Sequence, residues 1–199
     1  MHLVNGKIGF VPPYHHGDLR RALLSSAVDM ITEHGPAGVS LRELARRAGV
    51  SNAGPMHHFK DKAGLLTALA AEGFTLLAET LTATRERTDS FVELGVAYVR
   101  FAVEKRAHFE VMFRPDLHHP DDPALTEARE LAGAALAGGV EDVGDRHTGP
   151  DRRIAGVAAW SLVHGFATLW NTRNLDPELG DDPEELARRV AAVLFGQRG

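Results

Sequence analysis

Apolar residues recur along this chain three or four positions apart, as on helices, and no segment alternates as a half-buried strand would. We therefore predict an all-α fold of about nine helices. The first runs from about residue 17 to 34, the second follows Ser40 and ends at Gly49, and Ser51 caps the third. Six more are expected at about 61–81, 90–106, 108–113, 123–137, 151–172 and 183–195.

The segment from residue 40 to 51 carries the signals of two short helices joined by a tight turn. Ser40 is a favoured N-cap, and Glu43 three residues later completes the pattern of a capping box. Gly49 supplies the left-handed backbone that ends the first helix, and Ser51 can cap the next one. Two helices joined by a glycine-containing turn form a helix-turn-helix, whose second helix enters the major groove of DNA.

Charge is unevenly distributed along the chain. Residues 1–62 carry 8 Lys and Arg against 5 Asp and Glu, whereas residues 63–199 carry 14 against 22. A basic N-terminal third on an acidic remainder fits one small domain that meets DNA. We predict a flexible arm at 1–14, a helix-turn-helix domain at 15–62 and a C-terminal helical bundle at 63–199. The absence of cysteine excludes a disulfide framework and fits a cytoplasmic location.

The helix expected at 151–172 contains an uncharged run from Ile154 to Trp170, which approaches the length of a membrane span. Ser161, His164 and Thr168 interrupt it, so its hydrophobicity is modest. Burial between the protein core and a second subunit explains such a helix better than a lipid environment does, and we expect no membrane partner.

The sequence resembles the TetR family of bacterial transcriptional regulators. The similar positions are Tyr14–Arg20, Ser40–Ala45, Ala48–Ser51, His58–Lys62 and Leu65-Leu66. A second similarity, Trp160 followed by His164-Gly165, is found in the C-terminal domain of one branch, which also favours Pro at position 55. The resemblance implies a homodimer whose N-terminal domain binds a double-stranded DNA operator. Its C-terminal domain would dimerise and sense a small-molecule effector, and repression is the family's usual outcome.

The predicted DNA contacts surround the second helix of the helix-turn-helix. Asn52 can pair with adenine, and Ala53 can contact a thymine methyl group. Met56 stands where the family usually has a Tyr that touches a DNA phosphate, and a thioether cannot donate a hydrogen bond. The full set of candidate DNA-binding residues is Ser40, Arg42, Ser51, Asn52, Ala53, Met56, His57, Lys60 and Lys62.

The C-terminal part holds the side chains of a candidate ligand pocket and dimer interface. Aromatic and soft side chains supply the walls, and Tyr98 and His164 supply polar groups that could orient a ligand, although the same residues also describe an ordinary core. The pocket candidates are Phe74, Tyr98, Phe101, Phe109, Met112, Phe113, Trp160 and His164. The dimer candidates, at helical spacing on the last two helices, are Trp160, Leu186, Val190 and Val193.

Catalytic and metal-binding chemistry find little support. The chain has no phosphate-binding glycine loop, nucleophile elbow or zinc-protease motif. His118, His119, Asp121 and Asp122 share one loop that could hold a cation, but a solvated loop is the simpler interpretation. We expect no enzyme activity and no cofactor. The alternative is a helical small-molecule-binding protein that no longer binds DNA, with Met56 as its support; a small enzyme using His164 and Tyr98 is a weaker one.

Overall fold

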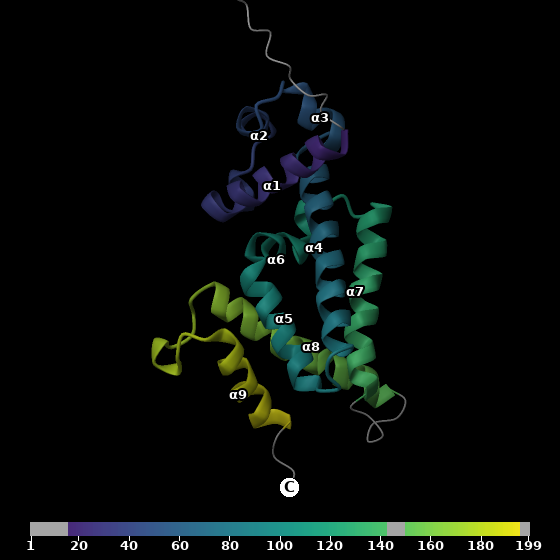
Figure 1. Ribbon diagram of the computed structural model, residues 1–199, viewed down its shortest axis with the longest axis vertical. Helices are drawn as coiled ribbons and strands as arrows, with labels where there is room; N and C mark the ends of the chain where they lie inside the picture. Colours follow the sequence, from purple (N-terminus) through teal and green to yellow (C-terminus); the bar gives the residue numbers. More distant parts are fainter. Residues whose placement is uncertain (1–15, 143–149, 196–199) are drawn as a thin grey trace, which may run out of the picture.

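The computed structural model describes residues 16–142 and 150–195, so the arm predicted at 1–14 lies outside the described residues. The described residues form nine α-helices and no strand (Figure 1), which confirms the predicted fold class. The helices are α1 His16–His34, α2 Leu41–Arg47, α3 Ala53–Phe59, α4 Lys62–Arg85, α5 Phe91–Glu104, α6 Arg106–Met112, α7 Pro123–Asp142, α8 Pro150–Asn171 and α9 Pro183–Phe195.

The first three helices form one end of the molecule, at the top of Figure 1. Leu23 and Ile31 of α1, Leu44 of α2 and Phe59 of α3 are all buried in the same apolar core. Arg47 of α2 also pairs with Glu33 of α1 at 2.7 Å. The short helices α2 and α3 are therefore held in place by packing on α1, since helices of this length are unstable alone.

The start of α2 differs from the prediction. Ser40 is the N-cap residue, but its side chain makes no capping bond, so the predicted capping box is absent. The carboxylate of Glu43 instead accepts hydrogen bonds from Arg46 and Arg47, at 2.7 and 3.1 Å. Bonds between two charged groups are stronger than a bond to a neutral amide, which explains why Glu43 faces the arginines.

The turn and the third helix follow the predicted pattern with a shift in register. Gly49 has φ +67°, as a left-handed residue at the end of the helix should. Helix α3 begins at Ala53, with Asn52 and not Ser51 as its N-cap. Pro55 is consequently the third residue of α3. Amides in the first turn of a helix have no partner within it, so Pro55 removes no hydrogen bond.

Helix α4 connects the two ends of the molecule. It runs from beside α3 to the lower part of Figure 1, next to α7, and packs against α5, α6 and α7. It ends at Arg85, four residues beyond the predicted end. Within the described part of the chain, α4 has the length and composition of a membrane span, but more than half of its apolar stretch is buried in the protein. Its apolar character therefore suits the central helix of a core.

Helices α8 and α9 both pack against α5. Leu186 and Ala187 of α9 join Val96 and Val99 of α5 and Phe166 of α8 in a second apolar core. An ion pair at 2.8 Å between Arg188 and Glu93 adds a polar link between α9 and α5. These contacts attach α9 to the bundle through one of its faces.

Candidate DNA-binding face and ligand cavity

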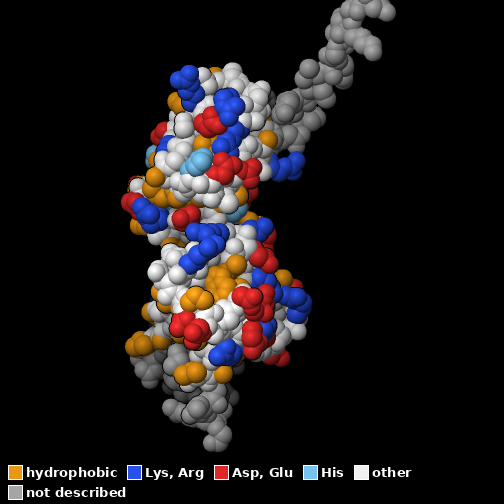
Figure 2. Space-filling model, turned by 90° about the vertical axis from the view of Figure 1, so that its left-hand side faces the viewer, with side chains coloured by type: hydrophobic (Ala, Val, Ile, Leu, Met, Phe, Trp, Pro, Cys, Tyr) orange, Lys and Arg blue, Asp and Glu red, His pale blue; other side chains and the backbone are white. Residues whose placement is uncertain are grey.

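The N-terminal end of α3 is exposed at the tip of the molecule. Ser51, Asn52 and Ala53 all lie on the surface, and the Asn52 side chain makes no capping bond with the helix. Its amide is therefore available to an external partner. Figure 2 shows Lys and Arg side chains on this upper end of the molecule.

The rest of α3 presents one face to the core and another to solvent. Pro55 and Phe59 are buried, whereas Met56 is 53% exposed and His57 is exposed. A side chain at position 56 thus points outward, as the family's usual Tyr would need to. Lys60 follows on the surface with φ +66°. The exposed side of α3, with the residues just before and after it, carries six of the candidate DNA contacts.

The remaining candidates lie on the flanks of α3. Ser40 and Arg42 are exposed at the start of α2. Lys62, at the start of α4, is half-buried, and its ammonium donates to the Ala37 carbonyl oxygen at 2.8 Å. An ammonium has three N–H donors, so two remain for a phosphate.

The junction between α3 and α4 is tightly built. The Asp61 carboxylate caps α4 by accepting from the Gly64 amide at 2.7 Å, and this bond lowers the pKa of Asp61. A Cβ atom on Gly64 would overlap the carbonyl oxygen of Phe59. The last turn of α3 therefore rests directly on the first turn of α4, and only glycine fits at position 64.

A cavity of about 940 Å³ lies among α4, α5, α7 and α8 and reaches α9. Its size is within the usual range of small-molecule sites. Six of the predicted pocket residues line it, namely Phe74, Tyr98, Met112, Phe113, Trp160 and His164. Phe101 and Phe109 are buried beside it in the core, and the Phe109 ring contacts those of Tyr98 and Phe113.

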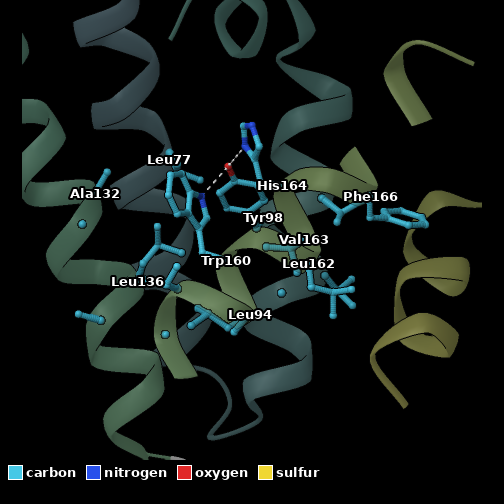
Figure 3. Close-up of a pocket in the computed structure, with 18 of the residues that line it drawn as sticks. Leu77, Leu94, Tyr98, Ala132, Leu136, Trp160, Leu162, Val163, His164 and Phe166 are labelled. Atoms are coloured by element: carbon cyan, nitrogen blue, oxygen red, sulfur yellow. Dashed lines mark hydrogen bonds between the residues drawn. The ribbon is translucent and has the colours of Figure 1, made fainter. Parts of the chain in front are cut away.

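Three polar side chains meet at the cavity wall (Figure 3). The Trp160 indole N–H donates to the Tyr98 oxygen at 3.2 Å, and the Tyr98 hydroxyl lies 2.9 Å from Nδ1 of His164. Burial raises the pKa of Tyr98 and lowers the pKa of His164, so both are neutral at pH 7. The Tyr98 oxygen thus accepts from Trp160 and shares a second hydrogen bond with Nδ1 of His164.

Several lining residues were not predicted from the sequence. Leu77 of α4 and Ala132 and Leu136 of α7 form one wall (Figure 3), and Arg129 of α7 adds a charge. Helix α7 reads as an ordinary amphipathic helix, so its spacing shows that one face is buried but not that a cavity lies against it. The cue that was available is Arg129, a cation close to the apolar face.

The dimer candidates differ widely in exposure. Leu186 is buried within its own subunit, and Val190 is half-buried beside the same core. Trp160 is 38% exposed and Val193 is 73% exposed. A further set of exposed apolar residues, Ile154, Val157 and Leu169, lies on α8. Burial of Leu186 is explained by α9 docking on α5, which the sequence alone does not reveal.

The histidine loop contributes to packing. His119 lies 3.1 Å from the Asp61 carboxylate, and its amide donates to the Thr67 hydroxyl at 2.9 Å. His118 is buried, with Nδ1 3.2 Å from the Arg129 guanidinium. Among the described residues, no three His, Asp or Glu side chains gather as a metal site would require.

Comparison with known proteins agrees with this architecture. A family described as bacterial regulatory proteins of the tetR family matches residues 23–69, and a tetracyclin repressor-like C-terminal domain matches residues 91–194. The HTH-type transcriptional regulator BetI of Rhizobium meliloti is 30% identical over 177 residues, which cover 89% of this chain and 74% of BetI. A solved protein of unknown function from Rhodococcus sp. RHA1 is 34% identical, with a TM-score of 0.77, and 94% and 98% of the two chains are covered.

An HTH-type transcriptional regulator of Mycobacterium tuberculosis is 28% identical over 139 residues, 62% of this chain and 59% of the relative. The chain therefore spans less than two thirds of the length of that relative. A helix-turn-helix joined to a hollow helical bundle defines the class as helix-turn-helix transcriptional regulators. Within that class, the chain belongs to the TetR family.

Proposed function

We propose that this protein is a homodimeric, ligand-responsive repressor that binds a DNA operator in the cytoplasm. The observation that carries the proposal is the position of α4. Its first turn supports the end of α3 through Gly64 and Phe59, and its middle lines the cavity with Phe74 and Leu77. One rigid helix thus touches both the DNA-reading element and the ligand space.

On DNA, the exposed end of α3 reads bases. Asn52 is placed to make a bidentate contact with adenine, and Ala53 offers a methyl group to thymine. His57, Lys60 and Lys62 follow on the exposed side and contact phosphates, which set the register of the helix on the duplex. Because Met56 stands in place of the family's usual Tyr, one phosphate contact is lost. The remaining cations supply the electrostatic attraction to DNA.

The dimer forms through α8 and α9. Ile154, Val157, Ser161, Thr168 and Leu169 are exposed at helical spacing along α8. No neighbouring atom lies within 4 Å of where a Cβ on Gly165 would sit. Together with the exposed Val193 of α9, this face fits a two-fold contact with its own copy. A two-fold dimer places its two reading helices about 34–36 Å apart, one turn of DNA.

A ligand acts by changing the distance between the two reading helices of the dimer. Filling the cavity displaces Phe74 and Leu77 and with them α4, so the population of the DNA-competent dimer falls. A dimer bound to a promoter blocks access to it. Without ligand the protein therefore represses transcription, and the ligand acts as an inducer.

Selection of bound sequences from a pool of random duplexes distinguishes the proposed function from the alternative, a helical binding protein without DNA affinity. We expect the bound duplexes to share a pseudo-palindrome whose half-sites lie one helical turn apart. The Asn52→Ala protein should select a motif relaxed at one position in each half-site. Recovery of unrelated sequences by the native protein would favour the alternative.

A further inference from the structure

Arg129 differs from Arg114 and Arg188 of the helical bundle in its partners. Arg114 pairs with Asp116 at 2.8 Å, and Arg188 pairs with Glu93 at 2.8 Å. Arg129 instead lines the cavity, and within residues 16–142 and 150–195 it has no carboxylate partner. Its charge is therefore uncompensated at the wall of an apolar space.

Two neutral groups hold the Arg129 guanidinium in place. It lies over the ring of Phe74, 5.6 Å from the ring centre, which is a favourable cation–π arrangement. One of its nitrogens lies 3.2 Å from Nδ1 of His118. Because a guanidinium can only donate, Nδ1 is an acceptor and His118 is neutral. Burial also lowers the pKa of His118. Both partners orient the cation, and neither one neutralises it.

The rest of the cavity offers no counter-charge. Its described lining contains two arginines, Arg129 and Arg153, and no Asp or Glu. The Trp160, Tyr98 and His164 cluster satisfies most of its own hydrogen bonds and is neutral. Apolar side chains form nearly all of the remaining wall. A ligand that matches this space has an apolar body and one negative group.

We infer that the effector is an apolar carboxylic acid, bound with its carboxylate on Arg129 and its body in the cavity. The inference rests on the proposed ligand response. A guanidinium has five N–H donors in a fork that fits a carboxylate, and His118 takes only one of them. Arg153 is exposed near the start of α8, so water screens its charge, and we assign the anchoring role to Arg129.

The same contacts link the carboxylate to the DNA-binding end. His118 holds Arg129, and the next residue, His119, donates its amide to Thr67 of α4 and reaches Asp61, the cap of α4. A carboxylate that draws Arg129 away from His118 acts on the segment that is bonded to the start of α4. The anion site is thus connected through two residues to the α3–α4 junction.

Calorimetric titration with decanoate and decan-1-ol tests the inference, because the two probes share a chain and differ in charge. We expect decanoate to bind the native protein more tightly than decan-1-ol does. Arg129→Met keeps the length of the side chain over Phe74 and removes the charge, and should weaken decanoate binding about tenfold to a hundredfold. Its Kd for decan-1-ol should stay within about twofold. Arg153→Met is the matched control and should leave the decanoate affinity nearly unchanged.

Three results would overturn the inference: equal binding of acid and alcohol by the native protein, loss of decanoate binding on Arg153→Met alone, or equal losses of both probes on Arg129→Met. Duplex binding measured on the same preparations is an independent readout. A native protein that binds its selected duplex but fails these titrations keeps its proposed DNA-binding role and loses only the carboxylate assignment. A native protein that binds decanoate through Arg129 but binds no duplex keeps the carboxylate assignment and loses the proposed DNA-binding role.

Discussion

Single residues at the exposed end of α3 separate two kinds of DNA contact. Asn52 has a short side chain with both donors and an acceptor, which suits a base edge. Lys60 lies about two turns further on, just after the end of the helix, and carries only charge. The residue types therefore assign base reading to the start of α3 and phosphate binding to its end.

Asn52→Ala should weaken binding to the selected duplex by about 1–3 kcal/mol and relax the preference at one base position. Lys60→Gln should weaken binding to all duplexes nearly equally and make the dependence of affinity on salt less steep. Both effects are measurable by fluorescence anisotropy on the selected duplex and its single-base variants. If Lys60→Gln changed the base preference and Asn52→Ala did not, the assignment would be reversed.

His164 should make the stability of the fold depend on pH in mildly acidic solution. Burial lowers the pKa of His164 in the folded protein below the ordinary value of 6.5. As the pH falls through 6.5, the unfolded chain takes up the proton first, so the free energy of unfolding decreases. Urea denaturation between pH 7.5 and 5.5 should show a smaller decrease for His164→Gln than for the native protein. An identical pH dependence would mean that His164 is no harder to protonate in the folded state.

At the residue scale, the sequence predicted the side chains that are unusual for their position. Trp160, His164 and Tyr98 stand out in apolar helices, and all three meet at the cavity wall. Arg129 was missed because a cation on an amphipathic helix ordinarily faces water. Its place over Phe74 follows from how α7 is rotated on α4, and rotation is a property of packing that no local pattern specifies.

At the scale of elements, the joint between α3 and α4 is the least tolerant part of the fold. The sequence predicted both helices but gave Gly64 no role, since a glycine early in a helix looks like a weakness of propensity. The structure explains it by the Phe59 carbonyl oxygen, which occupies the space of a side chain. The capping box at Ser40 failed for a related reason, because Glu43 found stronger partners in the folded state.

Gly64→Ala should push α3 away from α4. We expect a loss of about 1–3 kcal/mol in the free energy of unfolding and a larger loss in affinity for the duplex, because α3 is no longer held at its reading angle. Gly133→Ala is the matched control: it lies in α7 with open space where its Cβ would sit, and should stabilise the helix by up to about 1 kcal/mol. Urea denaturation and anisotropy measure the two effects, and unchanged stability in Gly64→Ala would contradict this account of the joint.

At the scale of the whole molecule, α8 presents an apolar face that its own subunit leaves uncovered. Ile154 and Val157 are 67% and 60% exposed. Helical periodicity predicted that this helix needs a partner beyond one domain, but not which side the partner covers. Obligate interfaces of this type commonly bury about 2,000 Å² or more, an area that two neighbouring helices from each subunit can provide.

Val193→Asp should convert the dimer into a monomer. Val193 is exposed in the subunit, so the substitution spares the fold of the subunit and places an unpaired carboxylate in the interface, which is strongly disfavoured. Leu131→Asp, at an exposed position of α7, should leave the dimer intact. Light scattering at a fixed concentration distinguishes the two. A stable Val193→Asp dimer would place the interface on another surface.

A salt series on two duplexes tests whether α3 reads a specific DNA sequence. The measurement is the affinity of the native protein for its selected pseudo-palindrome and for a scrambled duplex of equal length, by fluorescence anisotropy at several salt concentrations. We expect the selected duplex to bind about 10³-fold or more tightly. The logarithm of its affinity should fall with the logarithm of salt at about −0.9 per phosphate contact. Equal affinities for the two duplexes, or binding that salt does not weaken, would contradict the account.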